Sequence, residues 1–129
     1  MNHHKDIRVL VVDDEEVYRS MLETMLEPHG ISPAFATDAD GAIKVLQSQT
    51  FNVVILDVHM PGRNGVEVLS FVRQHYPATA VIMLTGTEEV QIARDCMKLG
   101  AFDFVTKPFA ASDLLETIVR ASTRGERST

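Results

Sequence analysis

The chain has 129 residues and a formal net charge of -6 at pH 7, with 12 Lys and Arg residues against 18 Asp and Glu residues. This length suits one domain with its own core, and the single cysteine, Cys96, excludes an internal disulfide and a cysteine-based zinc site. The acidic balance argues against non-specific binding to nucleic acids or anionic membranes. No stretch reaches the roughly 18 apolar residues of a membrane span, and the first residues lack the apolar segment of a signal peptide, so we expect a cytoplasmic protein.

Short apolar runs alternate with longer amphipathic stretches in the first half of the chain. The β-branched run at 7–12 predicts a strand, and apolar residues at helical spacing predict a helix over 16–29. A weaker strand at 32–36 precedes a helix at 39–49, for which Asp38 is the expected N-cap. The expected core-facing residues of the first helix are Val17, Met21, Leu22, Met25 and Leu26.

The same alternation continues through the second half of the chain. Strands are predicted at 51–56, 80–85 and 102–106. Helices are predicted from residue 66 to a point before Pro77, over 88–99, and from Ser112 onward with that serine as the N-cap. The expected core-facing residues of the 88–99 helix are Ile92, Ala93, Cys96 and Met97.

The strands read as nearly continuous apolar runs, which is typical of a parallel sheet covered by helices on both faces. A succession of strand–helix units therefore predicts a doubly wound α/β fold. We expect a single domain over residues 1–129, with a core of about 7–121 and a polar tail at 124–129.

Polar residues follow four of the predicted strands. Asp13 and Asp14 follow the first strand, and Asp57 follows the third. Thr85 ends the fourth strand, and Lys107 follows the last. Because doubly wound sheets bind their ligands beyond the carboxyl ends of the strands, we expect these side chains to share one site.

This combination of side chains suits phosphoryl transfer. Neighbouring carboxylates repel each other unless a cation lies among them, and Mg²⁺ prefers oxygen ligands. Lys107 and Thr85 offer a positive charge and a hydroxyl to phosphoryl oxygens, which leaves one carboxylate as the nucleophile. Each residue alone is as well explained as a cap, a turn residue or a surface charge, so the hypothesis rests on the whole set.

Four stretches make the chain resemble the receiver domain of two-component response regulators. They are Val-Leu-Val-Val-Asp13-Asp14-Glu, Val-Ile-Leu-Asp57-Val-His-Met-Pro-Gly, Val-Ile-Met-Leu-Thr85-Gly and Gly-Ala-Phe-Asp-Phe-Val-Thr-Lys107-Pro108. The resemblance spans residues 7 to about 121 and implies a flavodoxin-like fold, with five helices around a five-stranded parallel sheet of order 2-1-3-4-5. It also implies a signalling phosphoacceptor rather than an enzyme, which assists its own phosphorylation and autodephosphorylation.

The resemblance further implies a phosphoacceptor and a metal site. Asp57 is similar to the aspartate that takes a phosphoryl group from a sensor histidine kinase or a His-containing phosphotransfer protein. Asp14 and Asp57 would bind Mg²⁺ or Mn²⁺ directly, and Asp13 would reach it through water. The backbone carbonyl of His59 would be the third protein ligand, and its imidazole is either a guide or barrier for water, or merely a solvated loop side chain.

A conformational switch is implied as well. Thr85 would be the switch hydroxyl, Lys107 would pair with the phosphoryl group, and the Lys107–Pro108 bond would be cis. Phe104 stands at the aromatic switch position. The implied output surface comprises residues 88–98, Phe104 and the helix from Ser112, and it would contact a downstream protein, an output domain or a second copy of the chain, without direct binding to nucleic acid.

Three other functions compete with this interpretation. A flavin carrier of the same fold class needs a phosphate-binding loop after the first strand, where this chain has Asp13-Asp14-Glu15-Glu16. An aspartyl phosphatase would carry the phosphoryl group on Asp13 instead of Asp57. A receiver that serves only as an unphosphorylated scaffold would lack the site residues, all of which are present here.

Overall fold

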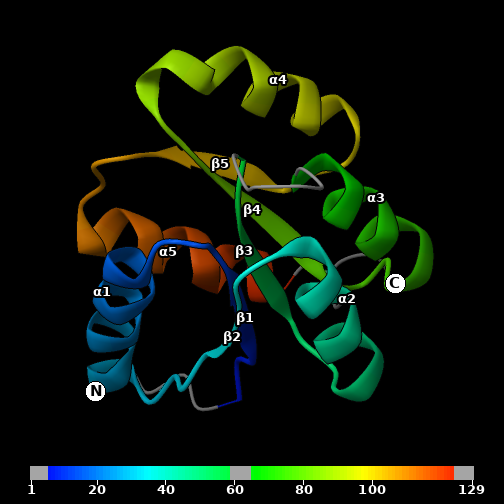
Figure 1. Cartoon of the computed structure of the whole chain (residues 1–129). Helices are drawn as coiled ribbons and strands as arrows, with labels where there is room; N and C mark the ends of the chain where they lie inside the picture. The colour runs from blue at the N-terminus through cyan, green and yellow to red at the C-terminus, as the bar shows by residue number, and fades with distance from the viewer. Residues whose placement is uncertain (1–5, 59–64, 124–129) are drawn as a thin grey trace.

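The computed structural model describes residues 6–58 and 65–123, except for the side chain of Thr87. Within these ranges the chain forms one five-stranded parallel sheet of order β2-β1-β3-β4-β5 (Figure 1). The strands are β1 (Val9–Val12), β2 (Ala34–Ala36), β3 (Val53–Asp57), β4 (Ala80–Thr85) and β5 (Asp103–Thr106). The predicted fold class and strand order are confirmed.

Helices cover both faces of the sheet. The α-helices are α1 (Glu16–Leu26), α2 (Ala39–Ser48), α3 (Gly65–His75), α4 (Val90–Lys98) and α5 (Ala111–Ser122), and short 3-10 helices occupy Glu27–His29 and Thr87–Glu89. Helices α1 and α5 pack on one face, and α2, α3 and α4 pack on the other (Figure 1). Among the described residues, no helix has the length and apolar character that crossing a membrane requires.

The core consists of two apolar layers, one on each side of the sheet. Neighbouring strand residues point to opposite faces, so Leu10 and Val12 join the layer under α2, α3 and α4, whereas Val9 and Val11 join the layer under α1 and α5. All residues of β1, β3 and β4 are buried. This burial explains why these three strands read as uninterrupted apolar runs in the sequence.

The predicted helix boundaries need three corrections. The helix expected over 16–29 ends at Leu26 and continues as a 3-10 turn, because Pro28 has no N–H to donate. The helix expected over 88–99 is likewise divided into a 3-10 turn and α4. Ser112 is not an N-cap, since α5 begins one residue earlier and Ala110 precedes it. The cap predicted at Asp38 is confirmed, because its side chain accepts a hydrogen bond from the Gly41 N–H.

The predicted core-facing stripes of two helices were too wide. Val17 is 64% exposed and Met21 is 41% exposed on α1, so only Leu22 and Leu26 of that helix are fully buried. On α4, Ala93 and Cys96 are buried, but Ile92 and Met97 are exposed. A helix lying on a sheet buries a narrower stripe than its apolar residues span, and the remaining apolar side chains lie on the surface.

Candidate functional site

The expected site residues come together at one edge of the sheet because parallel strands end on the same side. The pairing of Asp57 with Leu84, and of Thr85 with Thr106, aligns the carboxyl ends of β3, β4 and β5. Asp13 directly follows β1, whose last residue pairs with Leu56 of β3. The carboxyl ends of β1, β3, β4 and β5 therefore lie side by side at one edge of the sheet, together with the site residues at or just after them.

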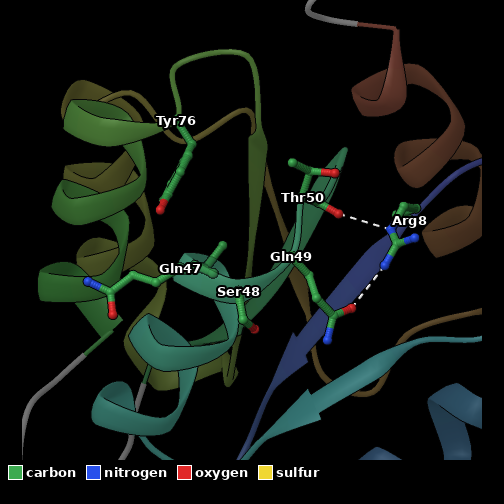
Figure 2. A pocket seen from close by; sticks show the side chains of 7 residues that line it. Arg8, Gln47, Ser48, Gln49, Thr50 and Tyr76 are labelled. Atoms are coloured by element: carbon green, nitrogen blue, oxygen red, sulfur yellow. Dashed lines mark hydrogen bonds between the residues drawn. The ribbon is translucent and has the colours of Figure 1, made fainter.

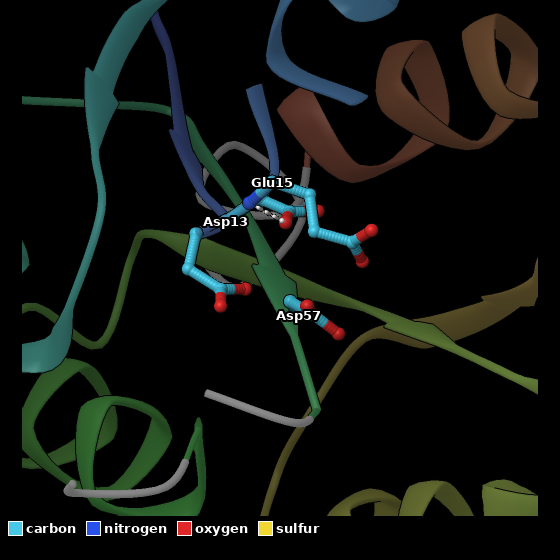
Figure 3. Close-up of side chains that lie close together, drawn as sticks. Asp13, Glu15 and Asp57 are labelled. Atoms are coloured by element: carbon cyan, nitrogen blue, oxygen red, sulfur yellow. Dashed lines mark hydrogen bonds between the residues drawn. The ribbon is translucent and has the colours of Figure 1, made fainter. Parts of the chain in front are cut away.

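Four carboxylates gather at this edge. One carboxylate oxygen from each of Asp13, Asp14, Glu15 and Asp57 lies within 4.8 Å of the others. Figure 3 shows Asp13, Glu15 and Asp57 of this group lying close together. Asp13 is 0% and Asp57 5% exposed, whereas Asp14 and Glu15 lie at the surface. Glu15 is a member of this cluster that the sequence reasoning did not select as a ligand.

The Asp13 carboxylate is incompletely satisfied. Its Oδ1 accepts a hydrogen bond of 2.9 Å from the backbone N–H of Glu15. Its Oδ2 is buried and accepts no hydrogen bond from any described residue, and Lys107 Nζ lies 3.5 Å away. A buried anionic oxygen without hydrogen bonds is costly. This orphaned oxygen, within a cluster made only of oxygen donors, fits a hard divalent cation such as Mg²⁺.

Lys107 brings a positive charge to the carboxylate cluster. Its Nζ lies 3.6 Å from Asp57 Oδ2 and 3.8 Å from Glu15 Oε1, in addition to the contact with Asp13. Burial acts to lower the pKa of Lys107, but the carboxylates of Asp57, Asp13 and Glu15 act in the opposite direction and prevail, so its pKa is raised. The ammonium is therefore charged at neutral pH and faces the carboxylates.

The backbone fixes Lys107 next to Thr85. The N–H of Lys107 donates to the carbonyl oxygen of Thr85 at 2.7 Å, and the Lys107–Pro108 peptide bond is cis, as expected. Thr85 is buried, and its hydroxyl donates to the Gly86 carbonyl at 3.1 Å. Phe104 is half-buried and packs against the apolar layer under α2, α3 and α4.

A cavity of about 360 Å³ opens at this edge. Its lining residues are Asp14, Glu15, Tyr18, Asp57, Gly86, Glu89 and Lys107. Tyr18 and Glu89 were not predicted, because the sequence reasoning followed only the residues directly after each strand. The signal that was available for Tyr18 is its place in the first turn of α1, just after the aspartate pair. His59, which was expected to offer its carbonyl, lies outside the described residues.

A second cavity, of about 480 Å³, lies at the opposite edge of the sheet and differs in chemistry (Figure 2). Its lining residues are Arg8, Leu46, Gln47, Ser48, Gln49, Thr50 and Tyr76. Arg8 donates from Nε to the Thr50 carbonyl and from Nη2 to Gln49 Oε1, both at 2.9 Å. Because this lining contains one cation and no carboxylate, it offers neither a cluster of hard ligands nor a carboxylate nucleophile.

Comparison with known sequences assigns a family to this geometry. Residues 9–119 match the response regulator receiver domain family. A putative response regulator NtrX-like protein of Rickettsia conorii is 32% identical over 115 residues, which cover 88% of this chain and 24% of that protein. The regulatory protein AtoC of Escherichia coli is 35% identical over 114 residues, covering 88% of this chain and 25% of that protein. The chain thus spans about a quarter of the length of these curated relatives.

Solved structures agree with the sequence comparison. The receiver domain of NtrX from Brucella abortus superposes with a TM-score of 0.85 at 31% identity, covering 88% of this chain and 97% of that one. A response regulator receiver domain protein from Clostridium thermocellum gives a TM-score of 0.89 at 30% identity, over 95% and 99% of the two chains. The chain belongs to the receiver domain family of two-component response regulators.

Proposed function

We propose that the chain accepts a phosphoryl group on Asp57 from the phosphohistidine of a sensor histidine kinase or of a phosphotransfer protein, in a reaction that depends on Mg²⁺ or Mn²⁺. The observation that carries this proposal is the position of Asp57. It is the last residue of a central strand, it is nearly buried, and its Oδ2 lies 3.6 Å from the Lys107 ammonium beside three further carboxylates.

The reaction is a phosphoryl transfer between a nitrogen and an oxygen. A carboxylate oxygen of Asp57 forms a bond to phosphorus, the P–N bond of phosphohistidine breaks, and the imidazole leaves with the electron pair. Lys107 then faces both Asp57 and the transferred group, whose negative charge it balances. The charge of Lys107 is needed because the transferred group enters a site that already holds four carboxylates.

The metal in this proposal is held by the acidic cluster. Asp13, Asp14 and Asp57 offer oxygen ligands, and the orphaned Oδ2 of Asp13 supports this assignment. A bound divalent cation supplies positive charge that neutralises the cluster and polarises a phosphoryl oxygen. Metal ligation by the His59 carbonyl, and an effect of the His59 imidazole on water that attacks the phosphoryl group, remain predictions.

Conformational signalling starts at Thr85 in this proposal. Its hydroxyl is engaged with the Gly86 carbonyl, and it gives up this bond to donate to a phosphoryl oxygen on Asp57. The acyl phosphate thereby favours a second conformation through contacts that only that conformation makes. Phe104 lies on β5, next to β4 and the α4 layer, so a rearrangement at Thr85 reaches it through neighbouring strands.

The proposed output surface is the face formed by α4, β5 and α5. Three apolar side chains of α4 and its end, Ile92, Met97 and Leu99, are exposed there and suit contact with a downstream protein, an output domain or a second copy of the chain. For the phosphodonor protein, we propose a contact surface on α1 rather than on α4. Val17 and Met21 are exposed on α1, which begins directly after the acidic residues that line the site cavity.

The decisive experiment locates the phosphoryl group. The chain is incubated with Mg²⁺ and acetyl phosphate, and the acyl phosphate is trapped with borohydride and mapped by peptide mass spectrometry. The label is expected on Asp57 and absent in Asp57→Asn, while Asp95→Asn, a change of an exposed aspartate on α4, serves as the matched control. A label on Asp13 would point to aspartyl phosphatase chemistry, and no label on any aspartate would leave a scaffold receiver.

A further inference from the structure

Tyr18 makes a contact that the proposed function does not use. It lies in the first turn of α1, half-buried, and its ring centroid is 4.0 Å from Lys107 Nζ. We infer that Tyr18 is a positioning residue for phosphoryl transfer, whose ring face holds the Lys107 ammonium in the site beside Asp57. This inference rests on the proposed function and adds to it the residue that positions the lysine ammonium, whose charge balances that of the transferred phosphoryl group.

The ion pairs alone do not fix the ammonium. Its distances to Asp13, Asp57 and Glu15 are 3.5, 3.6 and 3.8 Å, whereas a close charge-assisted hydrogen bond measures about 2.7–2.9 Å. Three similar, loose attractions leave the head of a flexible side chain free to shift among them. An additional contact helps to hold the ammonium at one position.

The tyrosine ring supplies that contact. The face of an aromatic ring carries negative electrostatic potential and attracts an ammonium that lies within about 6 Å of its centroid. Tyr18 and Lys107 line the same cavity, and the Lys107 side chain is only 12% exposed, so the contact is shielded from water.

Position matters because Lys107 acts on charge that develops during the transfer. A cation held in place before the reaction stabilises the transferring phosphoryl group without first having to be reoriented. Replacing Tyr18 by leucine keeps an apolar side chain at this position but removes the negative ring face. The Tyr18→Leu and Tyr18→Phe variants therefore separate packing and hydroxyl effects from the cation–π contact.

The kinetic test compares these variants at saturating Mg²⁺ with acetyl phosphate as the donor. We expect Tyr18→Leu to take up the phosphoryl group about threefold to tenfold more slowly than the wild type, the range that a shielded cation–π contact supports. Tyr18→Phe retains the ring and is expected within about twofold of the wild type. Tyr76→Leu, which changes the tyrosine of the opposite cavity, is the matched control and is expected to react like the wild type.

A spectroscopic test measures the contact without any reaction. In the unphosphorylated chain, the ring current of Tyr18 shifts the Lys107 Cε proton resonances upfield, and we expect this shift in the wild type and in Tyr18→Phe but not in Tyr18→Leu. Should Tyr18→Leu fail to fold, the wild type and Tyr18→Phe still decide whether the ring covers Lys107. Thermal unfolding of each variant verifies the fold before rates are compared.

The outcomes separate the inference from the proposed function. A wild-type rate in Tyr18→Leu, a slow Tyr18→Phe, or Lys107 Cε protons without an upfield shift overturns the inference while phosphorylation of Asp57 still stands. If the wild type takes up no phosphoryl group at all, the proposed function fails, and the positioning role fails with it.

Discussion

The two edges of the sheet each carry a cavity, but the charged side chains at the two edges differ in the partners that balance them. At the amino-terminal edge, Arg8 directs its guanidinium to the Thr50 carbonyl and the Gln49 side chain, and its backbone N–H donates to Asn52. At the carboxyl-terminal edge, a single ammonium faces several carboxylates, and Asp13 retains a buried oxygen without a hydrogen bond from any described residue. In the larger of these two cavities, at the amino-terminal edge, the one cation donates to groups of the lining, whereas the smaller cavity has an excess of negative charge.

Cavity size alone therefore does not select the candidate site in this molecule. A polar group that already has its hydrogen bonds gains little from a ligand, while an unbalanced cluster gains much from a cation or from a change of charge. The fold tolerates such a cluster because the surrounding strands and helices are fully packed on both faces. If the two edges differ in this way, substitutions at the carboxyl-terminal edge should change metal binding and phosphoryl uptake, and substitutions at the amino-terminal edge should not.

The largest effect is expected where the backbone of the site edge is most closely packed. A Cβ at Gly65, the first residue of α3, would lie 2.7 Å from the carbonyl oxygen of Asp57 and 3.4 Å from Leu56 Cγ. Because backbone must move to admit it, Gly65→Ala is expected to lower the free energy of unfolding by about 2 kcal/mol and to slow phosphoryl uptake. Urea unfolding measures the first effect.

Gly41 provides the matched control for this prediction. A Cβ there would meet the end of the Asp38 side chain at 3.0 Å rather than backbone. That side chain can give way, and alanine favours a helix over glycine by up to about 1 kcal/mol, so Gly41→Ala is expected to unfold within about 0.5 kcal/mol of the wild type. If Gly65→Ala and Gly41→Ala had the same free energy of unfolding, the close packing of backbone around Gly65 would be contradicted.

The second effect concerns the acidic cluster itself. Asp14→Asn removes one charged ligand at the surface of the site, so we expect an apparent Kd for Mg²⁺ about tenfold weaker. Because repulsion within the cluster falls, the same variant is expected to unfold at a higher temperature than the wild type when Mg²⁺ is removed with a chelator. Calorimetry with and without Mg²⁺ measures both quantities.

Glu16→Gln is the control for charge alone, since Glu16 is exposed next to the cluster but does not belong to it. It is expected to bind Mg²⁺ like the wild type. If both variants weakened Mg²⁺ binding equally, general electrostatics rather than ligation would explain the effect.

The smallest effect is expected at the opposite edge. Arg8→Met removes the exposed side-chain hydrogen bonds to Thr50 and Gln49, which we expect to cost about 1 kcal/mol of unfolding free energy. Phosphoryl uptake with acetyl phosphate is expected to match the wild type, because no charge at the site edge changes. A rate loss in Arg8→Met would show that the two edges are coupled.

Most of the fold could be predicted from the sequence because its parallel strands are buried on both faces. Runs such as 80–84 have no polar residue to obscure the pattern, and the structure places β4 over 80–85. The surface of each helix was harder to predict. Met21 and Ile92 stand at helical spacing with buried neighbours, yet they are exposed, since periodicity gives the direction of a helix face but not the width that the sheet covers.

The site could be predicted as far as strand ends define it. Asp13, Asp57, Thr85 and Lys107 follow from the rule that parallel strands deliver their carboxyl ends to one edge. Tyr18 and Glu89 depend on how α1 and the turn before α4 approach that edge, which no local pattern specifies. Glu15 was visible in the sequence, but only the structure shows its carboxylate joining the cluster.

The burial of β5 has a mechanical consequence. Every residue of β3 and β4 is buried, but all four residues of β5, at the end of the sheet, are only partly covered. Asp57 thus ends the buried central strand β3, whereas Lys107 follows the partly covered edge strand β5. If phosphorylation of Asp57, as we propose, strengthened its attraction for Lys107, we would expect β5 to shift more than the buried central strands.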